Sequence, residues 1–513
     1  MEQGLREKVG QLFMVGFDAL QANDHIKALI RQKKVGGVIL FRRNVHTPAQ
    51  VSALCRELQE INAEVSDTPL LISIDQEGGM VMRIEQGVTP IPAAMAFQAA
   101  GSVADCERMN RVSGDEMRQI GINMLLAPVL DVNNNRLNPV IGVRAYGEDA
   151  DTVIEYGTAA MRGQRASGIA VTAKHFPGHG DTAVDTHYAM ALVPHDKARL
   201  HAVELAPFRA AIAGGVDAIM TAHVVFPAFE ADTSVPATLS KAVLTDLLRG
   251  EMGYQGVVIS DCLEMAAISE GIGIPKGAIA TLQAGADIVL ISHREEQQHA
   301  AIEAVLQAVE KGEIEIARID EALARVAELK RVQAVHGWRE RPVAPPALMQ
   351  PEAMALSHQL QKAALRVAGQ FRALDASKPV TLITVEVRSR SEIDEVALGR
   401  NKEARSSMLP ALLEAGLDVR EYALSAEALD DEVDAAIAFA QGAQQIVLQT
   451  YNAMFVDGQR RLVAALPQDT LWLVAGRLPY DLDLAPDAQG RLASFGCRPA
   501  ALAPVVEKLA GKA

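Results

Sequence analysis

Short apolar segments alternate with longer amphipathic segments over the first two thirds of the chain. Eight of the short segments are nearly continuous in Val, Ile, Leu and Met, which is typical of parallel strands buried on both faces. These predicted strands are Leu12–Phe17, Val35–Phe41, Leu70–Asp75, Met124–Val132, Ile169–Phe176, Ala218–Phe226, Gly256–Leu263 and Asp287–Ser292. Apolar residues at helical spacing between them predict helices over Asp105–Gln119, Asp151–Arg165, Ala198–Ala213, Lys241–Met252 and Glu295–Glu310.

Strand–helix alternation repeated eight times predicts an α/β fold with a (β/α)8 TIM-type barrel over residues 1–337. An open doubly wound sheet is the alternative, but no GxGxxG turn follows the first strand. The proline-rich residues 338–351 fit neither periodicity and are interpreted as a linker. Beyond it, residues 352–513 predict a smaller three-layer α/β sandwich domain. Its expected elements are helices over Glu352–Ala368 and around Ser406–Ala415, and strands over Pro379–Val387, Leu417–Tyr422, Gln445–Thr450 and Leu471–Ala475.

Composition and charge narrow the function classes. Of the 513 residues, 49% are hydrophobic and 22% charged, as in ordinary globular proteins. The net charge of −15 disfavours nucleic acid and an anionic membrane surface as partners. The four cysteines are far apart, so neither a disulfide framework nor a structural zinc site is expected. We find no apolar run of the ~20 residues that span a bilayer and no signal-peptide pattern, so a cytoplasmic location is expected.

Five of the eight predicted strands end in an ionisable residue. In a (β/α)8 barrel the active site lies at the carboxyl ends of the strands. A single such residue is usually only the point where a strand reaches water, but five at corresponding places favour a polar site. These residues are Asp75, Asp131, Lys174 with His175, His223 and Asp261.

The segment from Lys174 to His187 holds three of the chain's 12 histidines. Its Gly and Pro content predicts a long loop, and loops of that length are often functional. Asp185 stands two residues before His187 and could fix one tautomer of its imidazole, which suits a proton donor and acceptor. A salt-bridged loop is the alternative.

Asp261 follows the apolar run Gly256-Val-Val-Ile-Ser, so it is expected to emerge from a buried strand into the barrel mouth. A rigidly held carboxylate there suits a nucleophile that attacks an anomeric carbon. The alternative, an N-cap of a following helix, has equal weight from the residues alone. A zinc site made by His175, His179, His187 and His223 is a third hypothesis, but the first strand offers no HxH pair. A phosphosugar site at Lys174 lacks a Gly-rich phosphate cradle.

Five motifs follow one another along the predicted barrel: Asp75-Gln-Glu-Gly-Gly, Ala127-Pro-Val-Leu-Asp-Val, Ile141-Gly-Val-Arg-Ala-Tyr-Gly-Glu-Asp, Lys174-His-Phe-Pro-Gly-His-Gly with Asp181-Thr-Ala-Val-Asp-Thr-His, and Ser260-Asp261. In these motifs the chain resembles glycoside hydrolase family 3, in particular its two-domain β-N-acetylglucosaminidase (β-N-acetylhexosaminidase) branch. The fourth motif is close to diagnostic of that branch.

The resemblance implies a role for each matching residue. Asp261 matches the catalytic nucleophile, and His187 with Asp185 matches the acid/base pair of this branch. The residues that match sugar-binding positions are Asp75, Arg83, Arg144, Lys174 and His175, with Asp131 and His223 as further pocket residues. Two positions depart from the pattern, because Met80 stands where many relatives have Arg and Cys262 where they often have a second Asp.

The resemblance also implies the reaction. It predicts retaining removal of terminal non-reducing β-linked N-acetylglucosamine, through a covalent intermediate and without a cofactor or metal. Cell-wall muropeptide fragments or chitooligosaccharides are the expected substrates, in carbohydrate metabolism such as peptidoglycan recycling. The low aromatic content of 4% disfavours a long ring-lined groove.

Three other functions and the oligomeric state stay open at this point. The alternatives are a β-N-acetylglucosaminide phosphorylase, a β-glucosidase of the same family and a non-catalytic sugar-binding protein. The sequence does not decide between a monomer and a homo-oligomer.

Overall fold

The computed structural model describes residues 2–182, 191–386 and 407–512. Its first unit is built on a sheet of eight parallel strands, each hydrogen-bonded to the strand before it along the chain. The strands are β1 (Phe13–Val15), β2 (Gly37–Leu40), β3 (Leu71–Ile74), β6 (Met124–Leu125), β7 (Ala170–Phe176), β9 (Ala218–Thr221), β11 (Val257–Ile259) and β12 (Val289–Ile291). Each lies within one of the predicted strands, so the predicted order and number are confirmed.

The sheet closes on itself. β12 pairs with β1, and a parallel bridge between Ile259 and Ile288 joins the seventh strand to the eighth. The open doubly wound alternative is therefore wrong. Strand residues such as Val38, Ile72 and Val258 are fully buried, which explains why the strands read as continuous apolar runs.

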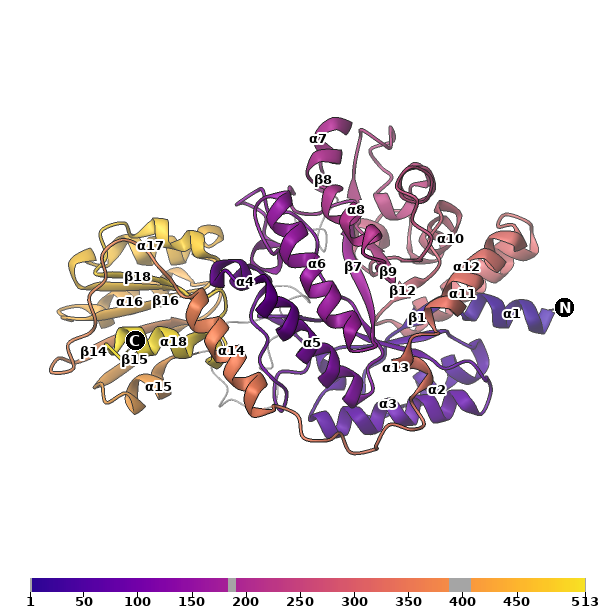
Figure 1. Ribbon diagram of the computed structural model, residues 1–513. Helices are drawn as coiled ribbons and strands as arrows, with labels where there is room; N and C mark the ends of the chain where they lie inside the picture. The colour runs from indigo at the N-terminus through magenta and orange to yellow at the C-terminus, as the bar shows by residue number, and fades with distance from the viewer. Residues whose placement is uncertain (1, 183–190, 387–406, 513) are drawn as a thin grey trace.

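Helices surround the barrel, as the alternation predicted (Figure 1). Those between or after the strands include α3 (Pro48–Ala63), α5 (Val103–Ile120), α6 (Ala150–Ala166), η5 (Ala242–Glu251), α10 (Ile274–Ala284), α11 (Glu295–Glu310) and α12 (Ile316–Leu329). The single helix predicted over Ala198–Ala213 is wrong in one respect. The structure has α7 (Lys197–Ala202) and α8 (Ala206–Ala213), because Pro207 lacks a backbone N–H and fits only the first turn of a new helix.

Residues 337–350 contain neither helix nor strand, as predicted for the linker. They are held against the barrel: Arg341 donates to the backbone oxygens of Ser52 in α3 and Gln119 in α5. The helix α14 (Pro351–Ala364) follows and packs on α5, on α4 (Ala94–Ala100) and on α18 (Pro499–Leu509). The predicted helix was four residues too long, since β13 (Arg366–Val367) begins there. The domain boundaries at 337/338 and 351/352 stay a prediction.

A second sheet, of six strands, forms the centre of the C-terminal unit. Its order is β13, β18 (Gly490–Ala493), β17 (Leu471–Ala475), β16 (Ile446–Thr450), β14 (Val380–Val385) and β15 (Val419–Leu424), parallel except at β13. Two apolar cores cover its two faces. Along β16, Ile446 and Leu448 enter one core and Val447 the other, with the alternation expected of a strand. The predicted three-layer sandwich is confirmed, and β13 and β18 were too short to be recognised from the sequence.

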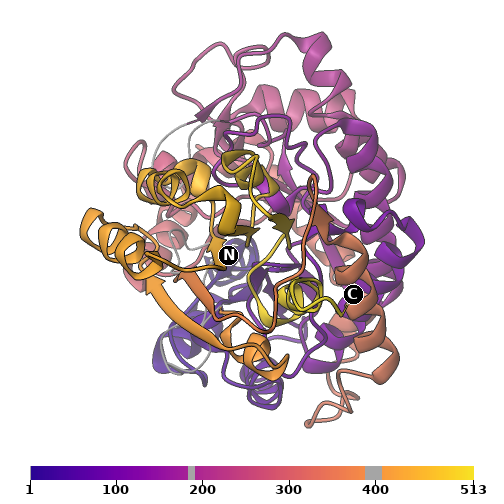
Figure 2. The same ribbon diagram turned by 90° about the vertical axis from the view of Figure 1, so that its left-hand side faces the viewer.

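The C-terminal unit lies at the opposite end of the barrel from the N-terminus, as Figures 1 and 2 show. Helix α1 (Glu2–Gly10) is at the far end, and the loops that follow the carboxyl ends of the barrel strands face the second unit. Within the described ranges, the helices are all too short or too polar to cross a membrane.

Candidate active site

A cavity opens at the carboxyl ends of the barrel strands. Six of the predicted site residues line it: Asp75, Arg83, Arg144, Lys174, His175 and Asp261. They come from separate strand ends or loops, so the barrel brings together residues that are up to 186 positions apart in the sequence.

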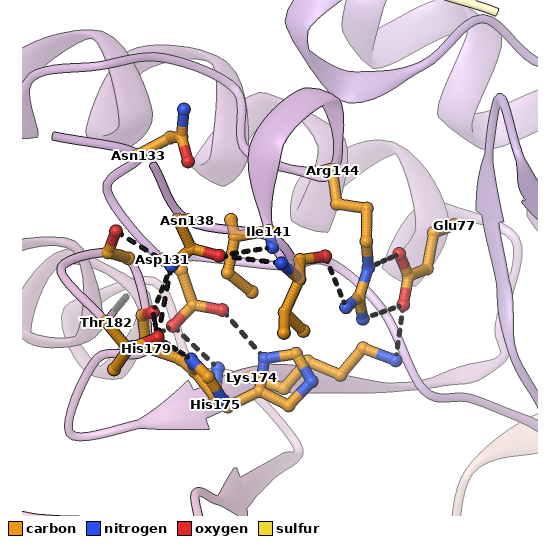
Figure 3. A network of polar contacts seen from close by, with 12 residues as sticks. Glu77, Asp131, Asn133, Asn138, Ile141, Arg144, Lys174, His175, His179 and Thr182 are labelled. Atoms are coloured by element: carbon orange, nitrogen blue, oxygen red, sulfur yellow. Dashed lines mark hydrogen bonds and ion pairs between the residues drawn. The ribbon is translucent and has the colours of Figure 1, made fainter. Parts of the chain in front are cut away.

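Four charged side chains form a continuous network on one wall of this cavity. The Lys174 ammonium lies 2.8 Å from Asp75 Oδ1 and 2.7 Å from Glu77 Oε1. Glu77 in turn accepts two hydrogen bonds of 2.8 Å from the Arg144 guanidinium (Figure 3). The Lys174, Glu77 and Arg144 side chains are each at most 6% exposed, so this network is almost fully desolvated.

The network holds its carboxylates in the charged form. Burial by itself would raise the pKa of Asp75, but the charges of Lys174 and Arg83 outweigh it and hold the pKa below its usual value. Burial would likewise raise the pKa of Glu77, and Arg144 and Lys174 hold it far below the usual range. Burial opposes the charge of Lys174, yet the two carboxylates raise the pKa of its ammonium. These residues therefore present fixed charges at neutral pH.

Asp131 lies behind the cavity wall and orients His175. Its fully buried carboxylate accepts from His175 Nδ1 at 2.7 Å and from the backbone N–H of His179 at 2.7 Å. The His175 ring is thus fixed with Nδ1 facing Asp131 (Figure 3). Asp131 was predicted as a further pocket residue. In the structure it lies behind His175, which lines the cavity, and does not line the cavity itself.

The loop that carries Arg144 is held by two asparagines. Asn138 Oδ1 accepts from the backbone N–H of Val140 and Ile141, while its amide donates to the carbonyl of His179 (Figure 3). Asn133 Oδ1 accepts from Gly142 N–H at 3.0 Å. These bonds hold both the residues before the 3-10 helix η3 (Gly142–Arg144) and its first residue, and so support the Arg144 guanidinium.

Asp261 lines the opposite wall, two residues after the end of β11. Its backbone N–H donates to Thr221 Oγ1 at 3.2 Å, and its Oδ1 accepts from Cys262 N–H at 2.7 Å. The helix that follows, α9 (Ala266–Ser269), starts from Met265 as its N-cap. The helix-cap alternative for Asp261 is therefore wrong, and the carboxylate faces the cavity.

His223 was predicted in the pocket, but it is fully buried behind Asp261. Its Nδ1 lies 2.8 Å from Thr238 Oγ1 and its Nε2 2.9 Å from the carbonyl of Cys262. Thr238 also contacts Thr221 at 2.7 Å. Thr221 thus binds the backbone N–H of Asp261, and His223 binds the carbonyl of the next residue, Cys262. His223 therefore helps to position the backbone of Asp261 and Cys262. With both ring nitrogens engaged in the protein, His223 does not fit the multi-histidine zinc hypothesis.

Asp185 and His187 lie outside the described residues. The segment that leads to them is described as far as Thr182, whose hydroxyl lies 2.9 Å from His179 Nδ1. Burial lowers the pKa of His179 to about 4, so this imidazole is neutral at physiological pH. The predicted acid/base pair stays a prediction.

Three residues that line the cavity were not predicted as site residues: Phe41, Glu77 and His293. Glu77 stood inside a quoted motif and could have been found as the residue two positions after Asp75. His293 directly follows the last residue of the eighth predicted strand, where the strand-end rule could have been applied once more.

The C-terminal unit contacts two of the loops that form the cavity. Tyr480 Oη lies 2.9 Å from Asn133 Nδ2 and is hydrogen-bonded to Glu148. Arg498 donates to the carbonyl of Met80 and pairs with Glu85 at 2.9 Å. Met80 packs with Val385, Tyr451 and Cys497 of the C-terminal unit, which gives an apolar function to the position where relatives have Arg.

Comparison with known proteins gives a consistent result. The model of the glycosyl hydrolase family 3 N-terminal domain matches residues 4–329. The chain is 37% identical over 290 residues to a β-hexosaminidase of Stenotrophomonas maltophilia (strain K279a), which covers 55% of this chain and 84% of that protein. It is 36% identical over 330 residues to β-hexosaminidase A of Pseudoalteromonas piscicida, which covers 60% of this chain and 54% of that protein.

One solved structure matches over both units. It is a glycoside hydrolase family 3 β-N-acetylglucosaminidase from Paenibacillus sp. str. FPU-7, with 44% identity and a TM-score of 0.93. The match covers 99% of this chain and 97% of that one.

Proposed function

The chain belongs to glycosyl hydrolase family 3 and is a glycoside hydrolase, and on this premise we propose that it removes terminal non-reducing β-linked N-acetylglucosamine. Hydrolysis of β-N-acetylglucosaminides is supported by its hexosaminidase and N-acetylglucosaminidase relatives. The finer proposal is a retaining reaction on cell-wall muropeptide fragments or chitooligosaccharides. This proposal depends on one observation above all, namely that Asp261 lines the same cavity as Asp75, Lys174 and Arg144.

In this mechanism Asp261 is the nucleophile. Its carboxylate attacks the anomeric carbon, the bond to the leaving-group oxygen breaks, and a covalent glycosyl ester forms. Water then attacks the same carbon, and the Asp261 carboxylate is released. The hydrogen bonds at Thr221 and Cys262 fix the backbone around Asp261, so the carboxylate enters the reaction without a large loss of freedom.

The proton transfers are assigned to His187, oriented by Asp185. His187 gives a proton to the leaving oxygen in the first step and takes one from water in the second. The pair takes the place of the second carboxyl group that most retaining glycosidases use. A neutral imidazole in that role adds no negative charge to a cavity that already carries Asp75, Glu77 and Asp261.

The ionic wall is assigned to the recognition of the sugar. Carboxylates accept and Lys or Arg donate hydrogen bonds, so Asp75, Lys174, Arg144 and Arg83 can each bind a ring hydroxyl. His175, held by Asp131, offers its second ring nitrogen to the same face. Among the lining residues that the structure describes, Phe41 is the one aromatic ring other than imidazole, so a small sugar fits better than a long stacked polymer.

The other candidate functions have less support. The three relatives described above are named as hexosaminidases or as an N-acetylglucosaminidase, so neither the phosphorylase nor the β-glucosidase alternative is favoured. The built cavity, with its fixed charges and a carboxylate opposite them, argues against a non-catalytic protein. The intracellular location and a role in peptidoglycan recycling stay predictions.

Release of p-nitrophenol from its β-N-acetylglucosaminide tests the proposal. The assay is run beside the β-glucoside, with and without phosphate, with identification of the sugar product and with Asp261→Ala as the inactive control. We expect hydrolysis of the N-acetyl sugar alone, unaffected by phosphate. Accumulation of the sugar 1-phosphate would establish a phosphorylase instead, and turnover of the glucoside alone would establish a β-glucosidase.

A further inference from the structure

Three side chains of the kinds that bind metal ions lie close together beside Asp261, on the wall of the cavity opposite to the ionic network. They are the Cys262 thiol, the Glu264 carboxylate and the His293 imidazole, and one ligand atom from each lies within 4.8 Å of the others. Cys262 and His293 line the cavity, so solvent ions can reach them. The assigned mechanism uses none of the three.

Two of the separations are close to those between the ligands of a tetrahedral ion. Glu264 Oε2 lies 3.7 Å from Cys262 Sγ and 3.1 Å from His293 Nδ1. Zinc bonds of about 2.0–2.3 Å at tetrahedral angles separate S, N and O ligands by roughly 3.3–3.6 Å. Shifts of a few tenths of an ångström therefore bring each of these two pairs to the separation that one ion requires.

The fold already holds Glu264 in the orientation that this site requires. Its carboxylate accepts from the backbone N–H groups of Ser292, His293 and Arg294, at distances of 2.6–2.8 Å. Oε1 accepts from Arg294, while Oε2 accepts from the backbone N–H groups of Ser292 and His293 and also lies beside the thiol and the imidazole. Since a thiolate, an imidazole and a carboxylate together are typical zinc ligands, the chemistry of the set agrees with its geometry.

We propose that Cys262, Glu264 and His293 form a binding site for zinc, or for another borderline-soft divalent ion, that inhibits the enzyme. On binding, the Cys262 thiol loses its proton to solvent, and a water molecule takes the fourth position on the cavity side. The ion takes no part in hydrolysis. Cys262 directly follows Asp261 and both residues line the cavity, so an ion held by the Cys262 thiolate shares the cavity with the nucleophile. Its charge and its water then oppose attack of the carboxylate on the sugar.

The binding test uses Co²⁺ as a spectroscopic substitute for zinc and needs no substrate. Purified full-length protein, freed of metal with a chelator, is titrated with Co²⁺ alone. A thiolate–cobalt charge-transfer band in the near ultraviolet is expected, and one equivalent of Zn²⁺ should abolish it. Cys262→Ser should lose the band, whereas Cys55→Ala, a buried cysteine in α3, should retain it. A visible cobalt spectrum without the charge-transfer band, or a band that survives in Cys262→Ser, would overturn the proposal.

The inhibition test compares the zinc concentration that halves the rate in several variants. Removing a ligand with Cys262→Ser or His293→Ala should raise that concentration at least about tenfold. A second group of three metal-binding side chains, Asp181, His195 and Glu204, provides the matched control. His195→Ala should leave the zinc sensitivity unchanged. Sensitivity lost in His195→Ala but retained in Cys262→Ser would place the ion at the other group and refute the proposal.

The two tests separate this proposal from the proposed function. Cobalt binding is measured on the protein without substrate, so an enzyme with another substrate would still show the charge-transfer band. Conversely, full hydrolysis of the N-acetylglucosaminide that is insensitive to zinc would refute the metal site alone. Glu264→Gln, which retains one acceptor oxygen for the Ser292 and His293 backbone N–H groups, checks the third ligand if the alanine variants fold poorly.

Discussion

The two walls of the cavity differ in how their carboxylates are held. On one wall, Asp75, Glu77, Lys174 and Arg144 bind one another, and each charge has an opposite partner within 3 Å. On the other wall, Asp261 accepts from the backbone N–H of its neighbour, and its own backbone N–H donates to Thr221. The first arrangement keeps four charges fixed for recognition, while the second fixes the backbone around a carboxylate that lines the cavity. Binding and reaction are therefore built from the same residue types in different surroundings.

The largest effect is expected from a substitution of Asp261. Asp261→Asn retains the size of the side chain but removes the nucleophile, so turnover of the N-acetylglucosaminide should fall by more than about 10⁴-fold. Steady-state rates measure the loss, and binding of N-acetylglucosamine by calorimetry should remain. A variant with more than a tenth of the wild-type rate would remove Asp261 from its assigned role.

The next largest effect concerns the proton transfer assigned to His187. His187→Ala should slow substrates with poor leaving groups by about 10²–10⁴-fold, because their oxygen must be protonated as it departs. Aryl glycosides with activated leaving groups should lose much less in the first step. Pre-steady-state rates of glycosylation on both kinds of substrate provide the comparison. Equal losses on the two kinds, in a folded variant that still binds the sugar, would contradict the role.

Removing one charge from the network of Asp75, Glu77, Lys174 and Arg144 should affect both the stability of the fold and the binding of the sugar. Glu77→Gln removes the carboxylate that binds Arg144 and leaves Lys174 with Asp75 alone, which costs about 3–5 kcal/mol of unfolding free energy and should raise KM more than it lowers kcat. Urea denaturation at pH 7 measures the first quantity. The matched control is Glu303→Gln, which removes a half-exposed partner of Arg6 and Lys33 and should cost less than about 1 kcal/mol.

The same variant changes the pH dependence of stability. The pKa of Glu77 is lowered in the fold, so its ionised form stabilises the protein above the usual Glu pKa of about 4.3. That contribution is lost as the pH falls from about 4.3 toward the lowered pKa. The wild type should therefore lose more unfolding free energy between pH 6 and pH 3 than Glu77→Gln. Equal losses would show that Glu77 is not held in its charged form.

The smallest effect is expected from the C-terminal unit, which contacts the loops rather than the cavity. Tyr480→Phe removes the hydroxyl that contacts Asn133 and Glu148, and it should cost about 1 kcal/mol and change KM by a few fold at most. Asp483→Asn breaks an exposed ion pair with Arg136 and serves as the control for contacts between the two units. A larger change in KM for the control than for Tyr480→Phe would argue against support of the Arg144 loop by Tyr480.

Much of this fold could be predicted from the sequence, because strand and helix periodicities reflect local burial. The apolar runs at Gly37–Leu40 and Val257–Ile259 appear as strands since both of their faces are covered. The break at Val203–Leu205 and the two short strands β13 and β18 could not be predicted in this way. A strand of two residues has no period, and its formation depends on a partner far along the chain.

For the site, the strand-end rule found residues but not their layer. It selected Asp131 and His223 together with Asp75 and Asp261, since all four follow apolar runs. Only the packing shows that Asp131 and His223 are fully buried and bound to protein partners, whereas the other two line the cavity. The rule omitted Glu77 and His293, because each lies one or two residues beyond the strand end.

The sequence by itself determined which elements form, their order and the residues that can carry the chemistry. It could do so because hydrophobic period and side-chain type are properties of neighbouring residues. The tertiary structure decided which charges form ion pairs with one another and which carboxylates line the cavity. Lys174 contacts Asp75 across 99 positions, and His293 contacts Glu264 across 29. Ion pairing and burial depend on such distances in space, which only the closed barrel sets.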